Sequence, residues 1–359
     1  MKKAKKSLTE TRKKTRTIYV GKVPVGGGNP IVVQSMTKTY TTDVKSTVKQ
    51  IKSLEASGCE VIRLAVPNME AAKVLGTIKK SINIPMMADI HFDWRLALEA
   101  VRQGIHGLRI NPGNIGAKWK VKEVVIAAED EGIPIRVGVN AGSLEKELLK
   151  KYGHPEPEAL VESAGKNIQI LEEMGFTNIK VSLKGSDVPT TVKAYRLFSE
   201  KYTYPLHIGI SEAGPPSTGI IKSSVGCGIL LSEGIGDTIR VSLTAEPEEE
   251  VRVAYEILKS LGLRKKGVEI ISCPTCGRCG IDLRRLVTEV EHRLREIDKP
   301  IKVAVMGCVV NGPGEAREAD FGIAGGKGLG ILFKKGKIIK KIKEELLLDE
   351  LMDEISLWK

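Results

Sequence analysis

Short apolar runs rich in β-branched residues alternate with longer amphipathic stretches over most of the chain. Each run has the length and composition of a strand, and each stretch places apolar residues at helical spacing. The expected strands are residues 31–36, 60–66, 84–89, 105–110, 133–139, 178–183, 205–210 and 238–243. The expected helices are residues 43–57, 69–80, 93–103, 117–131, 157–174, 189–201, 217–232 and 247–261.

Strand and helix alternate eight times between Ile31 and Leu261. Parallel strands require crossover helices, so eight such units predict an α/β fold, a closed (β/α)8 barrel of the TIM type. A doubly wound open sheet is the alternative, and the count of eight favours the barrel.

The segment after the barrel predicts a second, smaller α+β domain. It contains an expected strand at 301–307, a glycine-rich hairpin around AGGKGLG and an amphipathic C-terminal helix at 339–355. We therefore divide the chain into a basic N-terminal arm and lead-in (1–30), the barrel (31–261), a linker (262–272) and the α+β domain (273–359).

Polar side chains stand at or just beyond the end of nearly every expected barrel strand. The carboxyl ends of barrel strands form one mouth, where enzymes of this fold carry their chemistry. Any one of these residues could be an ordinary surface residue, but a ring of cations repels itself unless an anion binds. Since arginine matches phosphate oxygens bidentately, we expect a substrate with more than one phosphate. The residues are Gln34, Arg63, Asp89, His91, Arg109, Asn111, Arg136, Asn140, Lys180, Lys184, His207, Glu212, Arg240 and Ser242.

The net charge of +12 suggests nucleic acid as a partner, but its distribution argues against one. Residues 1–16 hold eight Lys/Arg and one Glu, so +7 of the charge lies in a short arm of a kind that is usually a solvated tail. Aromatic residues are 4% of the chain and do not interleave with basic ones, which disfavours base stacking. No apolar run is long enough to span a bilayer, and the N-terminus lacks the apolar core of a signal peptide, so we expect a cytoplasmic protein.

Four of the six cysteines lie in the last quarter of the chain: Cys273, Cys276, Cys279 and Cys308. In an intracellular protein this clustering favours a metal site over disulfides. Spacing alone leaves a structural zinc site and an iron–sulfur cluster equally favoured, because both accept this thiolate pattern. A zinc-containing nucleic-acid-binding protein is therefore the second functional hypothesis.

Longer motifs separate these alternatives by resemblance. The chain resembles the GcpE (IspG) family of 4-hydroxy-3-methylbut-2-enyl diphosphate synthases from about residue 16 to residue 340. The segments that carry the resemblance are QSMTKTYTTDV, ADIHFDWRLAL, LRINPGNIG, RVGVNAGSL, HIGISEAG, GDTIRVSLT, CPTCGR and GCVVNGPGEA.

The resemblance implies an oxidoreductase of the methylerythritol phosphate route to isoprenoids. The family reductively opens 2-C-methyl-D-erythritol 2,4-cyclodiphosphate to (E)-4-hydroxy-3-methylbut-2-enyl diphosphate, with reduced flavodoxin or ferredoxin as electron donor. It also works as a homodimer. The family's diphosphate-binding residues fall on Arg63, Arg109, Asn111, Arg136, Asn140, Lys184 and Ser242.

The resemblance also implies a [4Fe–4S] cluster held by three cysteines and one glutamate, which fall on Cys273, Cys276, Cys308 and Glu315. A carboxylate is a harder, more labile ligand than a thiolate and can yield its iron to a substrate oxygen, which makes Glu315 catalytic as well. Glu212, in the SEAG motif, is the expected proton donor. Cys279 stands where the family usually has no cysteine, and its spacing from Cys276 alone favours it as the fourth ligand.

Overall fold

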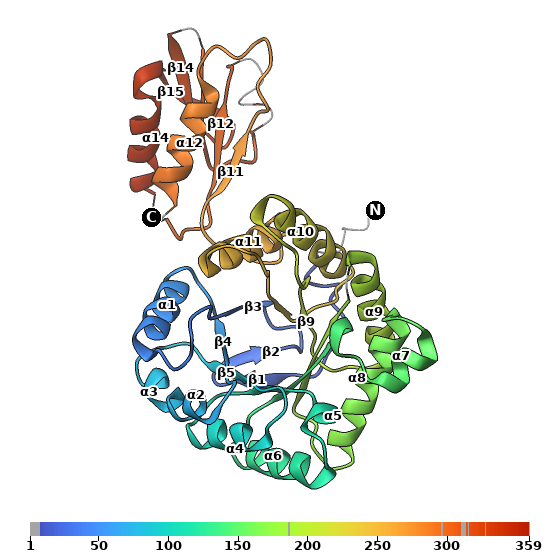
Figure 1. The fold of residues 1–359 in the computed structure, drawn as a ribbon. Helices are drawn as coiled ribbons and strands as arrows, with labels where there is room; N and C mark the ends of the chain where they lie inside the picture. Colours follow the sequence, from blue (N-terminus) through green and yellow to red (C-terminus); the bar gives the residue numbers. More distant parts are fainter. Residues whose placement is uncertain are drawn as a thin grey trace. The chain divides into compact units, whose positions relative to one another are not determined.

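The computed structural model describes residues 8–185, 187–295, 297–309, 314, 316–326 and 328–358. The chain forms two compact units, one ending at Arg264 and the other beginning at Lys265. Figure 1 shows the first unit as a ring of helices around strands and the second as a sheet with helices packed on it. No helix in these ranges is long and apolar enough to cross a membrane.

The first unit is a (β/α)8 barrel, which confirms the predicted fold. All strand pairs in its sheet are parallel, in the order β8-β7-β6-β5-β4-β3-β10-β9. A further parallel bridge between Val181 and Leu206 joins β8 to the segment before β9 and closes the ring. The strands are β3 (Val32–Met36), β4 (Val61–Ala65), β5 (Met86–Asp89), β6 (Leu108–Ile110), β7 (Ile135–Asn140), β8 (Ile179–Lys184), β9 (His207–Ile208) and β10 (Thr238–Ile239).

Amphipathic helices surround the strands and bury their apolar faces against them. The expected helix at 69–80 is two short helices, α2 and α3, which divide at Val74. The helices are α1 (Val44–Ala56), α2 (Met69–Lys73), α3 (Leu75–Lys79), α4 (Trp94–Arg102), α6 (Lys118–Asp130), α8 (Pro157–Glu172), α9 (Val188–Lys201), α10 (Pro216–Ser232) and α11 (Pro247–Ser260).

Several short elements were not predicted from the sequence. An antiparallel hairpin of β1 (Ile18–Val20) and β2 (Val23–Val25) precedes the barrel, and its apolar residues pack against Val32, Val61 and Met87. Because Val32 and Val61 begin their strands, the hairpin closes the end of the barrel opposite the mouth. Beyond the strand ends lie α5 (Pro112–Ile115), the 3-10 helix η1 (Ala141–Ser143) and α7 (Lys146–Tyr152).

The described part of the N-terminal arm is bound to the barrel, so the expectation of a solvated tail is wrong for these residues. The Arg12 guanidinium lies 2.8 Å from the buried carboxylate of Asp237. Backbone hydrogen bonds join Lys13 to Gly234 and Arg16 to Thr203. The prediction was wrong because a count of charges in the arm does not show that a buried acid elsewhere in the chain, Asp237, pairs with one of them.

The second unit is a five-stranded mixed sheet in the order β11-β12-β13-β14-β15, as expected for an α+β domain. Strands β11 to β13 are parallel, and β13, β14 and β15 are antiparallel neighbours. Helices α12 and α14 pack on one face of the sheet. The elements are β11 (Glu269–Ser272), α12 (Leu283–Leu294), β12 (Lys302–Met306), β13 (Phe321–Ala324), β14 (Leu329–Lys334), β15 (Lys337–Lys343), η2 (Glu344–Leu346) and α14 (Leu347–Ser356).

The expected C-terminal helix at 339–355 is wrong in its first half. Residues through Lys343 form β15, which pairs with β14 along its length, and the α-helix begins only at Leu347. The segment KIIKKIK fits either period over so few residues, and pairing with a neighbouring strand decides between them.

Candidate functional site

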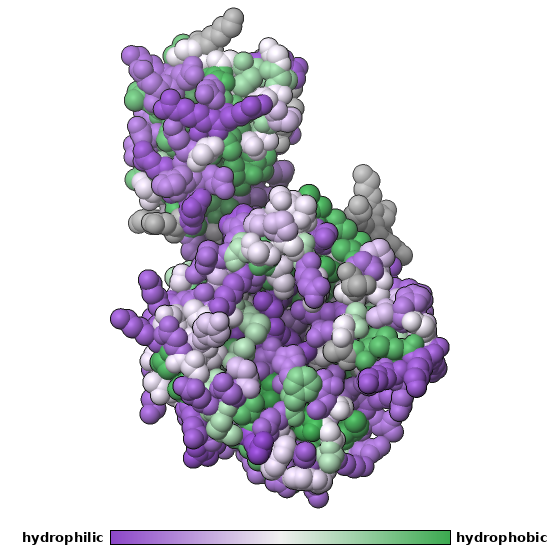
Figure 2. Space-filling model, in the orientation of Figure 1, coloured by the Kyte–Doolittle hydropathy of each residue, from purple (hydrophilic) through white to green (hydrophobic). Residues whose placement is uncertain are grey.

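A cavity of about 720 Å³ lies at the carboxyl ends of the barrel strands. Figure 2 shows hydrophilic residues gathered around a hollow at the centre of the barrel. The cavity draws side chains from nearly every strand and from the loops that follow. Its lining residues are Arg63, Asp89, His91, Arg109, Arg136, Asn140, Ala141, Gly142, Pro155, Lys184, Gly185, Ser211, Glu212, Arg240 and Ser242.

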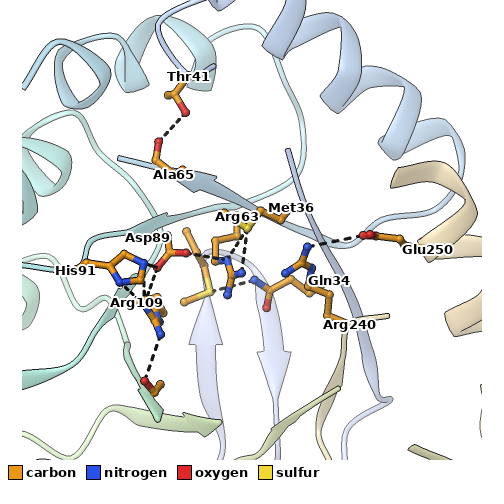
Figure 3. A network of polar contacts seen from close by, with 12 residues as sticks. Gln34, Met36, Thr41, Arg63, Ala65, Asp89, His91, Arg109, Arg240 and Glu250 are labelled. Carbon is orange, nitrogen blue, oxygen red and sulfur yellow. Dashed lines mark hydrogen bonds and ion pairs between the residues drawn. The ribbon is translucent and has the colours of Figure 1, made fainter. Parts of the chain in front are cut away.

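Asp89, at the end of β5, is the acid on which the neighbouring strands converge. Its carboxylate lies 3.4 Å from Arg63 Nε and 3.2 Å from Arg109 Nη1, with His91 Nε2 at 3.6 Å. Figure 3 shows these three side chains turned toward it. Burial acts to raise the pKa of this carboxyl, but the charges of Arg63 and Arg109 prevail and lower it. Asp89 is therefore ionised and offsets part of the positive charge.

Arg109 also depends on a close backbone approach. Its Nη2 donates to the carbonyl oxygen of Gly138 on β7 at 3.2 Å. A side chain at Gly138 would place a Cβ 2.6 Å from Arg109 Nε, so only glycine leaves room for the guanidinium in this position.

Two other cations of the cavity, Arg136 and Lys184, have no acid within ion-pair distance among the described residues. Arg136 is 1% exposed, and its Nε and Nη1 have no hydrogen-bond partner within the described ranges. Arg109 and Lys180 are its register neighbours on β6 and β8, so three cations stand side by side. Burial, followed by repulsion from neighbouring arginines, lowers the pKa of both Arg136 and Lys184 well below the ordinary range. Uncompensated buried cations cost folding free energy, and an anion in the cavity relieves that cost.

Six of the seven expected substrate-binding residues line this single cavity. They are Arg63, Arg109, Arg136, Asn140, Lys184 and Ser242. The seventh, Asn111, directly follows β6 and is buried outside the lining, and its Oδ1 has no hydrogen-bond partner within the described ranges. Glu212 also lines the cavity and adopts a φ of 53°, an uncommon conformation for a residue other than glycine.

Three other strand residues lie inside the barrel instead of lining the cavity. Gln34 Nε2 and Lys180 Nζ each approach Met87 Sδ at 3.8 Å, and His207 Nδ1 lies 2.8 Å from Thr238 Oγ1. Pro155, which lines the cavity, was missed because it carries no charge and lies in none of the motifs, and Gly142 was given no role because it is uncharged, although it lies in RVGVNAGSL. Arg240 lines it as well, and sequence reasoning noted its position but gave it no role.

The clustered cysteines occupy loops at one edge of the second unit's sheet. Cys273 directly follows β11, and Cys308 follows β12 after one residue. Because β11 and β12 are adjacent and parallel, their carboxyl ends lie together. The backbone N–H of Gly307 donates to Cys273 Sγ at 3.3 Å, which brings the two loops into contact.

The remaining thiols differ in their surroundings. Cys276 is exposed, and hydrogen bonds from the backbone and side chain of Arg278 lower the pKa of its thiol. Cys279 Sγ lies 3.3 Å from the carbonyl oxygen of Ile281. Cys59 and Cys227 are buried in the barrel, and burial raises the pKa of both thiols to about 12, as expected for packed cysteines.

The described residues hold no group of three or more His, Cys, Asp or Glu side chains close enough to bind a metal ion. Glu315, the expected fourth ligand, lies outside the described residues. The structure does bring the loops of Cys273 and Cys308 together, and thiolates accepting backbone N–H bonds suit an iron–sulfur cluster.

Comparison with known proteins assigns both units to one family. Residues 15–255 match the GcpE TIM-barrel domain, and residues 269–357 match the GcpE protein C-terminal domain. The chain belongs to the GcpE family. Full-length relatives of this GcpE chain include proteins from Thermodesulfovibrio yellowstonii, 65% identical over 96% of the chain and 99% of the relative, and Geobacter sulfurreducens, 61% identical over 96% and 97%. Both are named 4-hydroxy-3-methylbut-2-en-1-yl diphosphate synthase (flavodoxin).

Solved structures support the barrel of this GcpE protein independently. Dihydropteroate synthase from Yersinia pestis superposes with a TM-score of 0.51 at 12% identity, covering 68% of this chain and 98% of that one. At this identity the likeness concerns the fold alone. The zinc-containing nucleic-acid-binding alternative finds no support in the family or in these relatives.

Proposed function

We propose that this GcpE protein is an oxidoreductase that converts 2-C-methyl-D-erythritol 2,4-cyclodiphosphate to (E)-4-hydroxy-3-methylbut-2-enyl diphosphate. Two electrons and two protons are consumed, the ring C–O bond breaks, and the neighbouring hydroxyl leaves as water. Two synthases of this name are 65% and 61% identical to this protein over almost its full length, which supports the reaction. The observation that carries it is the cavity with more buried cations than acids, as a diphosphate requires.

Within the cavity, the cations and amides bind and orient the two phosphates. Arginine forks suit the phosphate oxygens, and Lys184 adds a compact charge. Ser242 and the amide of Asn140 supply neutral hydrogen bonds, and Asn111, which is buried outside the lining, is assigned to the diphosphate site by the family resemblance alone. Glu212, which lines the cavity, is the proposed proton donor to the departing hydroxyl.

The proposed cofactor is a [4Fe–4S] cluster on Cys273, Cys276, Cys308 and Glu315. Thiolates on two contacting loops fit such a group, and a glutamate would be a more labile ligand than a thiolate. When bound, the cluster supplies electrons one at a time for cleavage of the C–O bonds. Membership of the GcpE family supports iron–sulfur chemistry of this kind.

Reduced flavodoxin is the proposed electron donor, in keeping with the relatives' names, and ferredoxin is the alternative. We further propose a cytoplasmic homodimer. The roles proposed for the cavity residues do not depend on the electron donor, the location or the oligomeric state.

Anaerobic purification followed by metal and sulfide analysis tests the cofactor, and turnover of the cyclic diphosphate tests the reaction. We expect iron with equivalent sulfide and formation of the linear diphosphate. Zinc without sulfide would contradict the cofactor, and unchanged cyclic diphosphate in the presence of a loaded cluster and reductant would contradict the function.

A further inference from the structure

Glu250 is a buried carboxylate beside the cavity to which the proposed reaction gives no role. It lies in the first turn of α11 and is 2% exposed. The chain just before it forms the loop after β10, and Arg240 and Ser242 of that segment line the cavity. A buried acid costs free energy unless it is paired, so its contacts indicate what it does.

Three groups contact the Glu250 carboxylate. Its Oε1 accepts a hydrogen bond from the backbone N–H of Leu243 at 2.9 Å and lies 3.0 Å from Lys38 Nζ. Its Oε2 lies 3.8 Å from Arg240 Nη2 and has no hydrogen-bond partner among the described residues. Figure 3 shows Arg240 and Glu250 turned toward each other.

Lys38 brings a second loop to the same carboxylate. It belongs to the loop after β3, and its ammonium also donates to the backbone carbonyls of Leu243, at 3.0 Å, and Ala245. On the other side, the N–H of Thr244 donates to Gly214 in the loop that carries Glu212, at 3.0 Å. The loops after β3, β9 and β10 are therefore tied together beside Glu250.

We propose that Glu250 is a positioning residue that orients Arg240 and the Ser242 loop toward the substrate phosphates, with Lys38 as a second counter-charge. The proposal rests on the proposed function, because it names the group that holds part of the phosphate site. In the described part of the chain, Arg240 has no other acid within ion-pair distance. Without the charge of Glu250, the guanidinium loses its fixed partner and turns away from the cavity.

Binding of the cyclic diphosphate to the anaerobic holoenzyme tests this role by calorimetry. Glu250→Gln keeps an acceptor for the Leu243 N–H but removes the charge, and we expect about tenfold weaker binding at unchanged iron content. Glu249→Gln is the matched control, because Glu249 pairs with Arg252 on the same helix, at 2.6 Å, outside the cavity lining. The control should bind substrate as the wild type does.

A double-mutant cycle separates positioning from a general loss of structure. If Glu250 acts through Arg240, then Glu250→Gln costs little further affinity in an Arg240→Ala background. If Glu250→Gln folds poorly, Glu250→Asp in both backgrounds gives the same test, because the shorter side chain withdraws the charge from Arg240. Unchanged binding by the single variant, or additive effects in the cycle, would overturn the proposal. Absence of binding by the wild-type holoenzyme would instead contradict the proposed function.

Discussion

At the scale of single residues, Asp89 holds two of the cavity's arginines in place. Arg63 and Arg109 both pair with it, and all three side chains are buried. Asp89→Asn leaves two buried cations without a counter-charge, so we expect the free energy of unfolding to fall by about 3 kcal/mol at pH 7. Chemical denaturation of the substrate-free protein measures it, with the exposed Asp130→Asn as control.

The pH dependence of this difference has a defined sign. The pKa of Asp89 is lowered in the folded protein, so its stabilisation is fully present above the unfolded value of about 3.9. It is lost as pH falls through the lower folded value. The gap between wild type and Asp89→Asn should therefore be constant near neutrality and shrink below about pH 4. A gap that widened on acidification would contradict the pairing.

We expect Arg136 to strengthen substrate binding and to lower the free energy of unfolding of the substrate-free protein. Arg136→Leu removes a buried cation that has no ion-pair partner among the described residues, so we expect the free energy of unfolding to rise by about 1 kcal/mol while substrate affinity falls more than tenfold. Arg136→Lys should not restore affinity, because ammonium cannot bind phosphate bidentately. Calorimetry and chemical denaturation measure the two effects. Undiminished substrate affinity in Arg136→Leu would remove Arg136 from the phosphate site.

These residues could be assigned to the cavity from the sequence because they stand at the ends of expected strands, and the carboxyl ends of barrel strands form one mouth. Depth within the barrel could not be predicted in this way. Lys180 and Lys184 lie on the same strand, yet only Lys184 reaches the cavity. The pairing of Arg240 with Glu250 depends on a loop conformation that has no sequence pattern.

At the scale of elements, the N-terminal arm is a structural part of the barrel. Asp237 is 2% exposed, and Arg12 is its one ion-pair partner within the described ranges. Arg12→Ala should lower the free energy of unfolding by about 2 kcal/mol, less than a full buried pair because Thr15 and the N–H of Leu206 still donate to Asp237. Lys13→Ala is the control. The exposed ammonium of Lys13 donates only to Ser199 in the described hydrogen bonds of its side chain, so this variant should change the free energy of unfolding little. Equal effects of the two variants would show that the ion pair is unimportant.

The eight strands were predictable because burial on both faces of the sheet makes them nearly continuous apolar runs. Most barrel helices were predictable because one buried face gives each of them apolar residues at helical spacing. Hairpin β1–β2 was not, since its strands are three residues each and bury their apolar side chains against the strand starts of the barrel. Strand β15 was not either, because an exposed lysine-rich edge carries no burial pattern. Short elements whose form depends on tertiary pairing therefore escape the sequence pattern.

Cys279 and Glu315 are the two candidates for the fourth ligand of the proposed cluster. We expect Cys279→Thr to keep cluster and activity, because its thiol already bonds the Ile281 carbonyl, whereas Glu315→Ala should lose most activity and hold the cluster weakly. Cys308→Ser is the control and should lose the cluster with the barrel still folded. Iron and sulfide content, with electron paramagnetic resonance of the reduced cluster, measures the outcome. Loss of cluster in Cys279→Thr but not in Glu315→Ala would reverse the assignment.

At the scale of the whole molecule, the net charge of +12 favours an acidic electron carrier. Association between opposite charges slows as salt screens them, so turnover with subsaturating flavodoxin should fall severalfold from about 0.01 M to 0.5 M salt. Turnover driven by a small chemical reductant should change far less and serves as the control. Flat salt dependence with flavodoxin would exclude electrostatic steering of the donor.

The measurement that tests the central claim most directly is anaerobic turnover of 2-C-methyl-D-erythritol 2,4-cyclodiphosphate by the cluster-loaded protein, with electrons counted against product. We expect one molecule of (E)-4-hydroxy-3-methylbut-2-enyl diphosphate for every two electrons consumed, and none without reductant. A cluster-loaded protein that binds the cyclic diphosphate but consumes electrons without forming this product would contradict the account.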